Sequence, residues 1–337
     1  MIITNPGSST AKRGAVTVLL VAAIVFPVLF SNPVDTNYGV YALLYAAVAS
    51  AWNLFSGFSG YISLGHAVFF GSGAYVLGIA AREWNVQGNT VFVLLALSAV
   101  TAALIAVPFG LIALRVRRHT FIVVTIAVFF IFQLMAFNFW FTGGTTGISA
   151  PFLPWSPVRF NDTFYYIMLA IAVAATAVAW AIRRSRFGLQ LRAIRDDEDR
   201  ARGLGVRAMR VKLAAFVISG AFTGLAGGVW FLYLAQVLPQ SGFNPLFDLA
   251  IVLMAFLGGL GSIAGPVLGA LLIEPGQLYL YTRLTNGYLS EIILGGVFLA
   301  VVLFLPRGII PTGTELLGKT RKRPSPPAPA RELAGRP

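Results

Sequence analysis

The side chains that most often carry out chemistry are scarce in this sequence. It has two histidines, His66 and His119, which lie in different segments, and it has no cysteine. The absence of cysteine excludes a disulfide, a zinc–thiolate site, iron–sulfur ligation and a thiol nucleophile. The sequence also contains no H-x-x-x-H pair and no G-x-S-x-G elbow. We therefore expect no catalytic residue, no metal site and no cofactor bound by this chain itself.

Ionisable side chains are nearly absent from the apolar parts of the chain. Glu274 is the only one well inside an apolar run, while Asp248 and Glu291 lie near the ends of such runs. Transporters coupled to protons or voltage usually place charges at mid-membrane. The pattern argues against an ion-driven carrier, although sodium sites built from backbone carbonyls keep that alternative open. For Glu274, a structural hydrogen bond and a substrate contact both remain open.

Glycines form two clusters in otherwise apolar sequence. Gly57, Gly60 and Gly65 belong to the first cluster, and Gly258, Gly259 and Gly261 to the second. Both clusters contain the pattern F-x-G-x-x-G, once in each half of the chain. Glycine lets helices approach closely, and it also breaks helices where the backbone lines a cavity. Close helix packing and broken helices around a translocation path are both open.

Polar residues interrupt the same apolar runs. Asn53, Ser63 and His66 stand beside the first glycine cluster, and Thr125 stands in a later run. Hydrogen bonds between helices are the usual role of such residues in a membrane. A role in lining a path is the alternative for each, and a packed structural role is preferred for His66.

The segment 183–212 carries a dense mixture of charges. Ten lysines and arginines and four acidic residues occur within it. Leu191, Ile194, Ala201 and Leu204 recur at helical spacing, which predicts one amphipathic helix over 189–204 that ends at Gly205. Such a helix between two apolar runs is typical of a docking surface for a soluble partner, and a merely solvated loop is the alternative.

These features belong to a chain that is strongly apolar as a whole. Of 337 residues, 57% are hydrophobic and 11% are charged, whereas soluble domains have about 25% charged residues. Ten apolar runs occur, near 15–31, 38–56, 61–81, 90–114, 120–141, 163–182, 211–235, 245–260, 265–281 and 288–305. About 20 apolar residues cross a bilayer as a helix. The fold class is therefore all-α: a polytopic membrane protein with eight to ten transmembrane or re-entrant helices.

The basic residues indicate how the chain is oriented. With ten spans and the N-terminus inside, 22 of the 25 lysines and arginines lie on one side, and only Arg82, Arg159 and Arg283 lie on the other. Positive segments mark the cytoplasmic side, so both termini are predicted to be inside. This divides the chain into a cytoplasmic N-terminus (1–14), a membrane domain (15–306) and a basic, proline-rich cytoplasmic tail (307–337). The tail is expected to be disordered and able to lie on anionic lipid.

Four sequence blocks together resemble the inner-membrane permease subunits of ABC importers for branched-chain amino acids, of the LivM type. The resemblance runs from about Tyr41 to Gly308. The first block is 52–75, with S-L-G-H-A at 63–67, and the second joins Thr125 to T-G-G-x-x-G-I at 142–148. The third is 192–212, which is similar to the E-A-A-x-x-x-G coupling loop of ABC importers. The fourth is L-G-G-L-G-S at 257–262 with Gly265, Pro266 and Gly269.

The third block matches the coupling-loop pattern only in part. Asp199, Ala201 and Gly205 occupy its first, third and seventh places, while Arg200 departs from the second. The resemblance implies that this loop seats in an ATPase subunit. The residues that it assigns to ATPase coupling are Arg195, Asp196, Glu198, Asp199, Ala201 and Gly205.

The resemblance also implies the partners and the path. A paralogous permease of the LivH type would complete the pore, two cytoplasmic ATPase subunits would carry ATP and Mg²⁺, and an extracytoplasmic binding protein would deliver the substrate. No nucleic acid is expected as a partner. The residues assigned to the translocation path, as a hypothesis, are Asn53, Gly57, Gly60, Ser63, Gly65, His66, Thr125, Gly143, Gly144, Gly258, Gly259 and Gly261.

Two alternatives to import of branched-chain or other hydrophobic amino acids remain. Related permeases with the same blocks are associated with urea, short amides or aromatic acids. A self-sufficient channel or secondary carrier belongs to a different class, and it has no need of a docking helix in 183–212. In either case the chain is a transport protein of the bacterial inner membrane rather than an enzyme.

Overall fold

The structure is a computed structural model that describes residues 6–30, 32–283, 287–304, 308–310 and 312. The described chain is almost entirely helical, as the sequence predicts. Its only sheet in this part of the chain is the antiparallel pair β1 (Ile148–Ser149) and β2 (Gln236–Val237), with Ile148 opposite Val237. The all-α class is confirmed.

The helices follow the apolar runs closely. The first half contains α1 (Pro6–Leu29), α2 (Pro33–Trp52), α3 (His66–Glu83), α4 (Leu95–Ala113), α5 (Arg118–Asn138) and α6 (Pro157–Arg184). The second half contains α7 (Arg186–Asp196), α8 (Glu198–Gly203), α9 (Ala208–Leu234), α10 (Pro239–Gly242), α11 (Pro245–Gly258), α12 (Gly265–Arg283) and α13 (Gly287–Phe304). Four short turns of other helix types are η1 (Asn53–Gly57), η2 (Gly88–Leu94), η3 (Trp140–Thr142) and η4 (Gly144–Thr146).

Each of the ten apolar runs corresponds to a helix. Among the described residues, six segments are long and apolar enough to cross a membrane: Pro33–Gly57, Gly88–Ala113, Arg118–Asn138, Pro157–Arg184, Ala208–Leu234 and Pro239–Gly258. The neighbouring runs 38–56 and 61–81 form separate helices, as do 245–260 and 265–281. In the first pair, the segment 58–65, whose residues 60–65 are not helical, separates η1 from α3.

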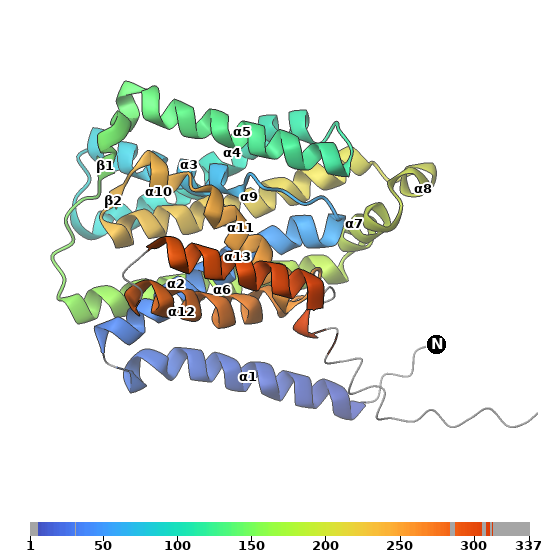
Figure 1. The fold of residues 1–337 in the computed structure, drawn as a ribbon, viewed down its shortest axis with the longest axis horizontal. Helices are drawn as coiled ribbons and strands as arrows, with labels where there is room; N and C mark the ends of the chain where they lie inside the picture. The colour runs from blue at the N-terminus through green and yellow to red at the C-terminus, as the bar shows by residue number, and fades with distance from the viewer. Residues whose placement is uncertain (1–5, 31, 284–286, 305–307, 311, 313–337) are drawn as a thin grey trace, which may run out of the picture.

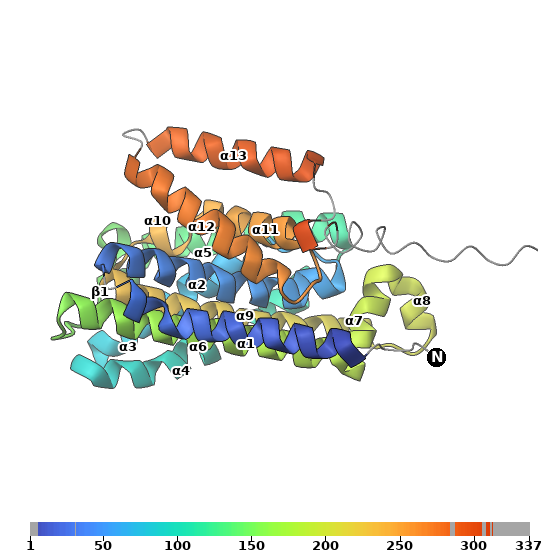
Figure 2. The same cartoon turned by 90° about the horizontal axis from the view of Figure 1, so that it is seen from below.

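The long helices run side by side along the longest axis of the molecule (Figure 1). The short helices α7 and α8 extend from one end of the bundle, and β1 and β2 lie at the opposite end. We refer to these as the α7–α8 end and the β end. Helix α1 begins and α13 finishes toward the α7–α8 end (Figure 1). Figure 2 shows α13 at the margin of the bundle, beyond α12.

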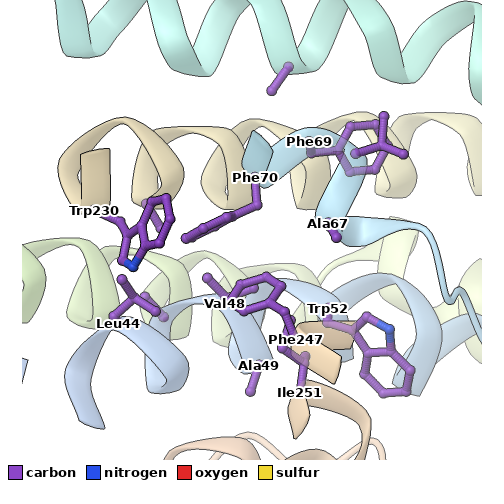
Figure 3. Close-up of a cluster of buried hydrophobic side chains, with 14 of the residues drawn as sticks. Leu44, Val48, Ala49, Trp52, Ala67, Phe69, Phe70, Trp230, Phe247 and Ile251 are labelled. Carbon is purple, nitrogen blue, oxygen red and sulfur yellow. The ribbon is translucent and has the colours of Figure 1, made fainter. Parts of the chain in front are cut away.

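The core lies among α2, α3, α9 and α11. Figure 3 shows apolar side chains from these four helices meeting there, including Val48, Phe70, Trp230 and Phe247. Glycines let α3 and α9 approach closely, because a Cβ on Gly73 would lie 2.1 Å from the carbonyl oxygen of Gly224. Close approach of small residues is a common basis of helix packing in a membrane, because lipid removes most of the hydrophobic driving force for association between helices.

Proline and asparagine mark where several helices begin. Helix α2 starts at Pro33 after Asn32, whose side chain accepts a hydrogen bond from the backbone N–H of Val34 at 3.1 Å. Helix α11 repeats the arrangement at Pro245, with Asn244 as the cap. Proline costs little in the first turn, where its missing N–H has no intrahelical partner, and asparagine satisfies one of the free donors.

The structure corrects the single helix predicted over 189–204. Asp197 has an extended backbone, with φ −155° and ψ 109°, and it divides the segment into α7 and α8. Its side chain accepts from the N–H groups of Asp199 and Arg200, both at 3.0 Å. The cap competes successfully with continuation of the helix. Leu204 also leaves the predicted apolar stripe, because it is 86% exposed.

The predicted termini fall largely outside the described residues. The N-terminal segment 1–14 is described only from Pro6, where α1 begins earlier than the apolar run. In the tail 307–337, the structure describes 308–310 and 312 only. The cytoplasmic placement of both termini and the lipid contact of the tail stay predictions.

Candidate functional site

The residues assigned to ATPase coupling divide between two faces of α7 and α8. Glu198 and Ala201 turn toward the bundle, and Ala201 is 2% exposed. Asp196, Asp199 and Gly205 are exposed on the outer side. The inner face therefore fastens the two short helices to the bundle, and the outer face is exposed.

Glu198 lies at the centre of the inner face. Its carboxylate accepts hydrogen bonds from the Tyr61 hydroxyl, from Lys212 Nζ at 2.9 Å and from Arg202 Nη2 at 2.5 Å. The Lys212 side chain is only 1% exposed, and its ammonium also lies 4.1 Å from the centroid of the Tyr61 ring. These contacts join α8 to the start of α9 and to the segment 58–65.

The charge of Glu198 is set by opposing effects. Burial raises the pKa of its carboxyl, while the hydrogen bonds from Tyr61 and Lys212, with the positive charges of Lys212 and Arg202, lower it. The net pKa lies below the usual value for glutamate. Glu198 is therefore ionised at neutral pH and provides a counter-charge for Lys212, whose burial would otherwise be costly.

The two glycine clusters meet at the same end of the bundle. Asn53 joins them directly: its Nδ2 donates to the Ser262 carbonyl at 2.8 Å, and its Oδ1 accepts from the Gly261 N–H at 2.7 Å. Arg195 Nη1 donates to the Gly57 carbonyl at 2.8 Å. The Gly57 and Ser262 carbonyls and the Gly261 N–H thus have protein partners in this structure.

His66 is fully buried, and both of its ring nitrogens have partners. Nε2 lies 2.7 Å from Ser219 Oγ, and Nδ1 lies 3.1 Å from Ser63 Oγ. Ser219 Oγ donates its hydrogen to the Ala51 carbonyl at 2.6 Å. The Ser219 oxygen must therefore accept from His66, which assigns the ring hydrogen to Nε2 and leaves Nδ1 to accept from Ser63. The geometry is that of a structural histidine.

The segment 58–65 is held by the other polar residues predicted for the path. Thr125 Oγ1 accepts from the Leu64 N–H at 3.1 Å and donates to the Ile122 carbonyl at 2.8 Å. The Ser63 carbonyl accepts from the Trp52 indole N–H at 2.8 Å. Thr125 and Ser63 therefore fix non-helical backbone inside the bundle, where unpaired groups would be costly.

Gly143 and Gly144 do not join the other path residues. They lie in the turn before β1 at the β end, with φ values of +76° and +54°. The strand β2 lies beside this turn, and its Gln236 Nε2 donates to the Thr146 carbonyl at 3.2 Å. Gly143 has no room for a side chain, because a Cβ would lie 2.1 Å from the Gly147 carbonyl oxygen. The predicted path set thus divides between opposite ends of the bundle.

Two buried carboxyl groups have an unpartnered oxygen in the described structure. Asp248 Oδ1 accepts from the Ala67 N–H at 3.1 Å, at the start of α3, while Oδ2 has no hydrogen-bond partner. Glu274 Oε2 and the nearby Gln277 Oε1 are unpartnered as well. Sequence reasoning did not assign Asp248 to the site; its acidic side chain close to an apolar run was the available signal. The structural hydrogen bond considered for Glu274 is therefore not made through Oε2.

A surface pocket of about 280 Å³ lies near the β end. It is lined by Pro33, Val34, Asn37, Tyr38, Asn161 and Leu278, none of which belongs to the predicted path. In the described part of the chain, no three acidic or histidine side chains converge as metal ligands would.

One sequence pattern in the tail is typical of nucleotide sites. Residues 313–320 read G-T-E-L-L-G-K-T, which fits the phosphate-loop pattern G-x-x-x-x-G-K-[ST]. Phosphate loops connect a β-strand to a helix, and this stretch lies outside the described residues, after the apolar helix α13. The pattern alone does not establish a site, and the absence of a nucleotide on this chain stays a prediction.

Comparison with known proteins gives consistent matches. The family described as "Branched-chain amino acid transport system / permease component" matches residues 36–302. The permease protein LivM of a high-affinity branched-chain amino acid transport system in Escherichia coli K12 is 28% identical over 90% of this chain and 76% of its own. LivH of the same kind of system in Salmonella typhimurium is 26% identical over 79% of this chain and 91% of its own. No solved structure matches the chain.

Proposed function

The chain belongs to the family of branched-chain amino acid transport permeases, and we propose that it works as one permease subunit of an ATP-driven importer. It is a polytopic transport protein of the inner membrane. In the proposal, a paralogous LivH-type permease completes the path, and an extracytoplasmic binding protein supplies a branched-chain or other hydrophobic amino acid. Two ATPase subunits dock on the outer face of α7 and α8.

One observation carries the proposal: the contrast between the two faces of α7 and α8. The inner face is fastened by Glu198 to Lys212 and Tyr61. The outer face presents Asp196, Asp199 and Arg200, together with Leu204 at 86% exposure. A rigidly held element with a large exposed leucine among charges fits a docking surface for a soluble protein better than a solvated loop.

A channel or secondary carrier would have no need for two short helices that are fastened on one face and exposed on the other. The relatives named LivM and LivH support the pairing of two permeases and the class of substrate, because both belong to branched-chain amino acid systems. Import of urea or short amides by the same kind of permease stays the alternative for the substrate.

The test changes the outer face only. Leu204→Glu in the assembled transporter should remove the ATPase subunits on purification and reduce ATP-dependent uptake of labelled leucine at least about tenfold, as loss of a buried anchor does. Phe152→Glu is the matched control, because Phe152 is 83% exposed but lies in the loop after β1. Retained ATPase subunits and unchanged uptake in Leu204→Glu would contradict the proposed docking surface and favour a carrier.

The substrate is tested separately. In cells that depend on this transporter, labelled leucine, isoleucine and valine should compete with one another for uptake, and urea should not. Uptake of urea or acetamide without uptake of the three amino acids would replace the substrate assignment and leave the permease role intact.

A further inference from the structure

Arg195 lies where three separate segments of the chain come together. It is near the end of α7, and its guanidinium Nη1 donates to the Gly57 carbonyl at 2.8 Å, in the last turn of η1. A Cβ added to Gly60 would lie 3.1 Å from Arg195 Cγ. A Cβ added to Gly261 would lie 2.4 Å from Arg195 Nη1. The side chain therefore packs against both glycine turns at once.

Both glycine turns are confined by their backbone conformation and by close contacts that a Cβ would meet. Gly60 and Gly261 have φ values of +74° and +77°, which residues other than glycine rarely adopt. Gly57 is equally confined, since its Cβ would meet Asn53 Oδ1 at 2.0 Å. The two turns are joined by the Asn53 hydrogen bonds to Gly261 and Ser262. They form one unit built from both halves of the chain.

Other contacts also hold α7 and the adjoining α8. Arg118, at the start of α5, donates from Nη2 to the carbonyls of Ile194 and Arg195, at 2.9 and 2.5 Å. The Glu198 cluster holds the adjoining α8 and reaches Tyr61, the residue after Gly60. Along the covalent chain, α7 is connected to the glycine turns only through α6 on one side and α9 on the other, and both are long helices. Arg195 is a much shorter physical connection, and its side chain contacts both turns, whereas the Glu198 cluster reaches only the first.

We infer that Arg195 is a positioning residue that connects the docking helix α7 to the paired glycine turns at 57–60 and 259–262. The inference rests on the proposed function, since it concerns how a displacement of α7 reaches the membrane helices. Arginine suits the task because its planar guanidinium presents several donors in a fixed arrangement. The residue thus acts on the inner side of the docking element, away from the ATPase.

The chain offers a clean reporter of the glycine turns. It has no cysteine, so Ala264→Cys introduces a single thiol, and Ala264 is exposed in the turn between α11 and α12. In the full transporter with its ATPase subunits, the rate of maleimide labelling of this thiol is compared without nucleotide and with ATP and vanadate. The labelling rate should differ between the two conditions when Arg195 is present.

Arg195→Ala should make the labelling rate independent of nucleotide and reduce the amount of leucine transported per ATP hydrolysed by about tenfold, the usual effect of losing a charge-assisted hydrogen bond. The ATPase subunits should still co-purify. Arg192→Ala is the matched control on the same helix, because Arg192 bonds only to nearby carbonyls of Gly188 and Arg183. Arg195→Lys, which keeps the positive charge but replaces the planar guanidinium with an ammonium, should lie between the wild type and Arg195→Ala.

Other outcomes overturn the inference in distinguishable ways. If the labelling rate still depends on nucleotide in Arg195→Ala, or does not depend on it in the wild type, Arg195 does not connect α7 to the turns. In both cases, retained ATPase docking and leucine uptake would still support the importer. Loss of the ATPase subunits in Arg195→Ala makes it a docking residue instead. If Arg195→Ala does not fold, Arg195→Lys decides: full coupling in that variant contradicts the requirement for a guanidinium.

Discussion

The contacts of Glu198 in the structure differ from those that its place in the sequence suggests. The sequence places it among the coupling residues because it lies in a charged segment that resembles a coupling loop. The structure turns it inward, where it is the shared acceptor for Tyr61, Arg202 and Lys212. Its contacts attach α8 to the bundle, and its role in ATPase coupling stays a prediction.

Replacing Glu198 tests this directly. In Glu198→Gln the ammonium of Lys212 stays buried without a carboxylate, and breaking such a pair on one side costs about 3 kcal/mol. The expected result is a comparable fall in the free energy of unfolding, measured by denaturation of the chain in detergent micelles.

The adjacent acid provides the control. Asp199 pairs with Arg117 at 3.5 Å, but the two side chains are 69% and 89% exposed, so Asp199→Asn should cost less than about 1 kcal/mol. Equal losses in the two variants would show that the inward position of Glu198 has no energetic consequence.

Among the elements, the pairing of α3 with α9 depends on backbone contact. A Cβ on Gly227 would lie 2.0 Å from the Phe70 carbonyl oxygen, and one on Gly73 would meet Gly224. No rotamer change relieves a clash between Cβ and backbone, so the helices themselves must separate. The segment 58–65 and the start of α3 would move with them.

Gly227→Ala should accordingly destabilise the bundle by about 1–3 kcal/mol, the range for forced overpacking. Gly276→Ala makes the same change in α12, where nothing lies within 4 Å of the added Cβ, and should stay within about 1 kcal/mol of the original protein. Thermal unfolding of both variants in the same detergent measures the contrast. A neutral Gly227→Ala would mean that α3 and α9 do not depend on this approach.

For the whole molecule, the arrangement separates two chemically different ends. The α7–α8 end carries the docking helices and the joined glycine turns, and the β end carries the T-G-G turn and the surface pocket. The distribution of basic residues predicts that the α7–α8 end is cytoplasmic.

Thiol labelling in intact cells can establish that orientation. Arg200→Cys in α8 should react with a membrane-impermeant maleimide only after the cells are permeabilised, whereas Thr145→Cys, exposed in the turn before β1, should react without permeabilisation. Labelling of both from the same side, or in the reverse pattern, would contradict the predicted orientation.

Much of the element order could be predicted from the sequence. Hydrophobicity over about 20 residues is a local property, and each of the ten apolar runs corresponds to a helix. The clusters of glycine likewise identified the places where helices end or pack closely. The break at Asp197 was missed because a side-chain cap competed with a helical pattern that the sequence supports on both sides.

What the sequence determines by itself is the membrane class, the helix positions and the family, because these depend on local hydrophobicity and on ordered motifs. The tertiary structure decides which faces those residues use. It brings Asn53 to Gly261 and Arg195 to Gly57, and it places Asp248 at the start of α3. Contacts between residues more than a hundred positions apart depend on how helices pack, and hydrophobic periodicity does not specify that packing.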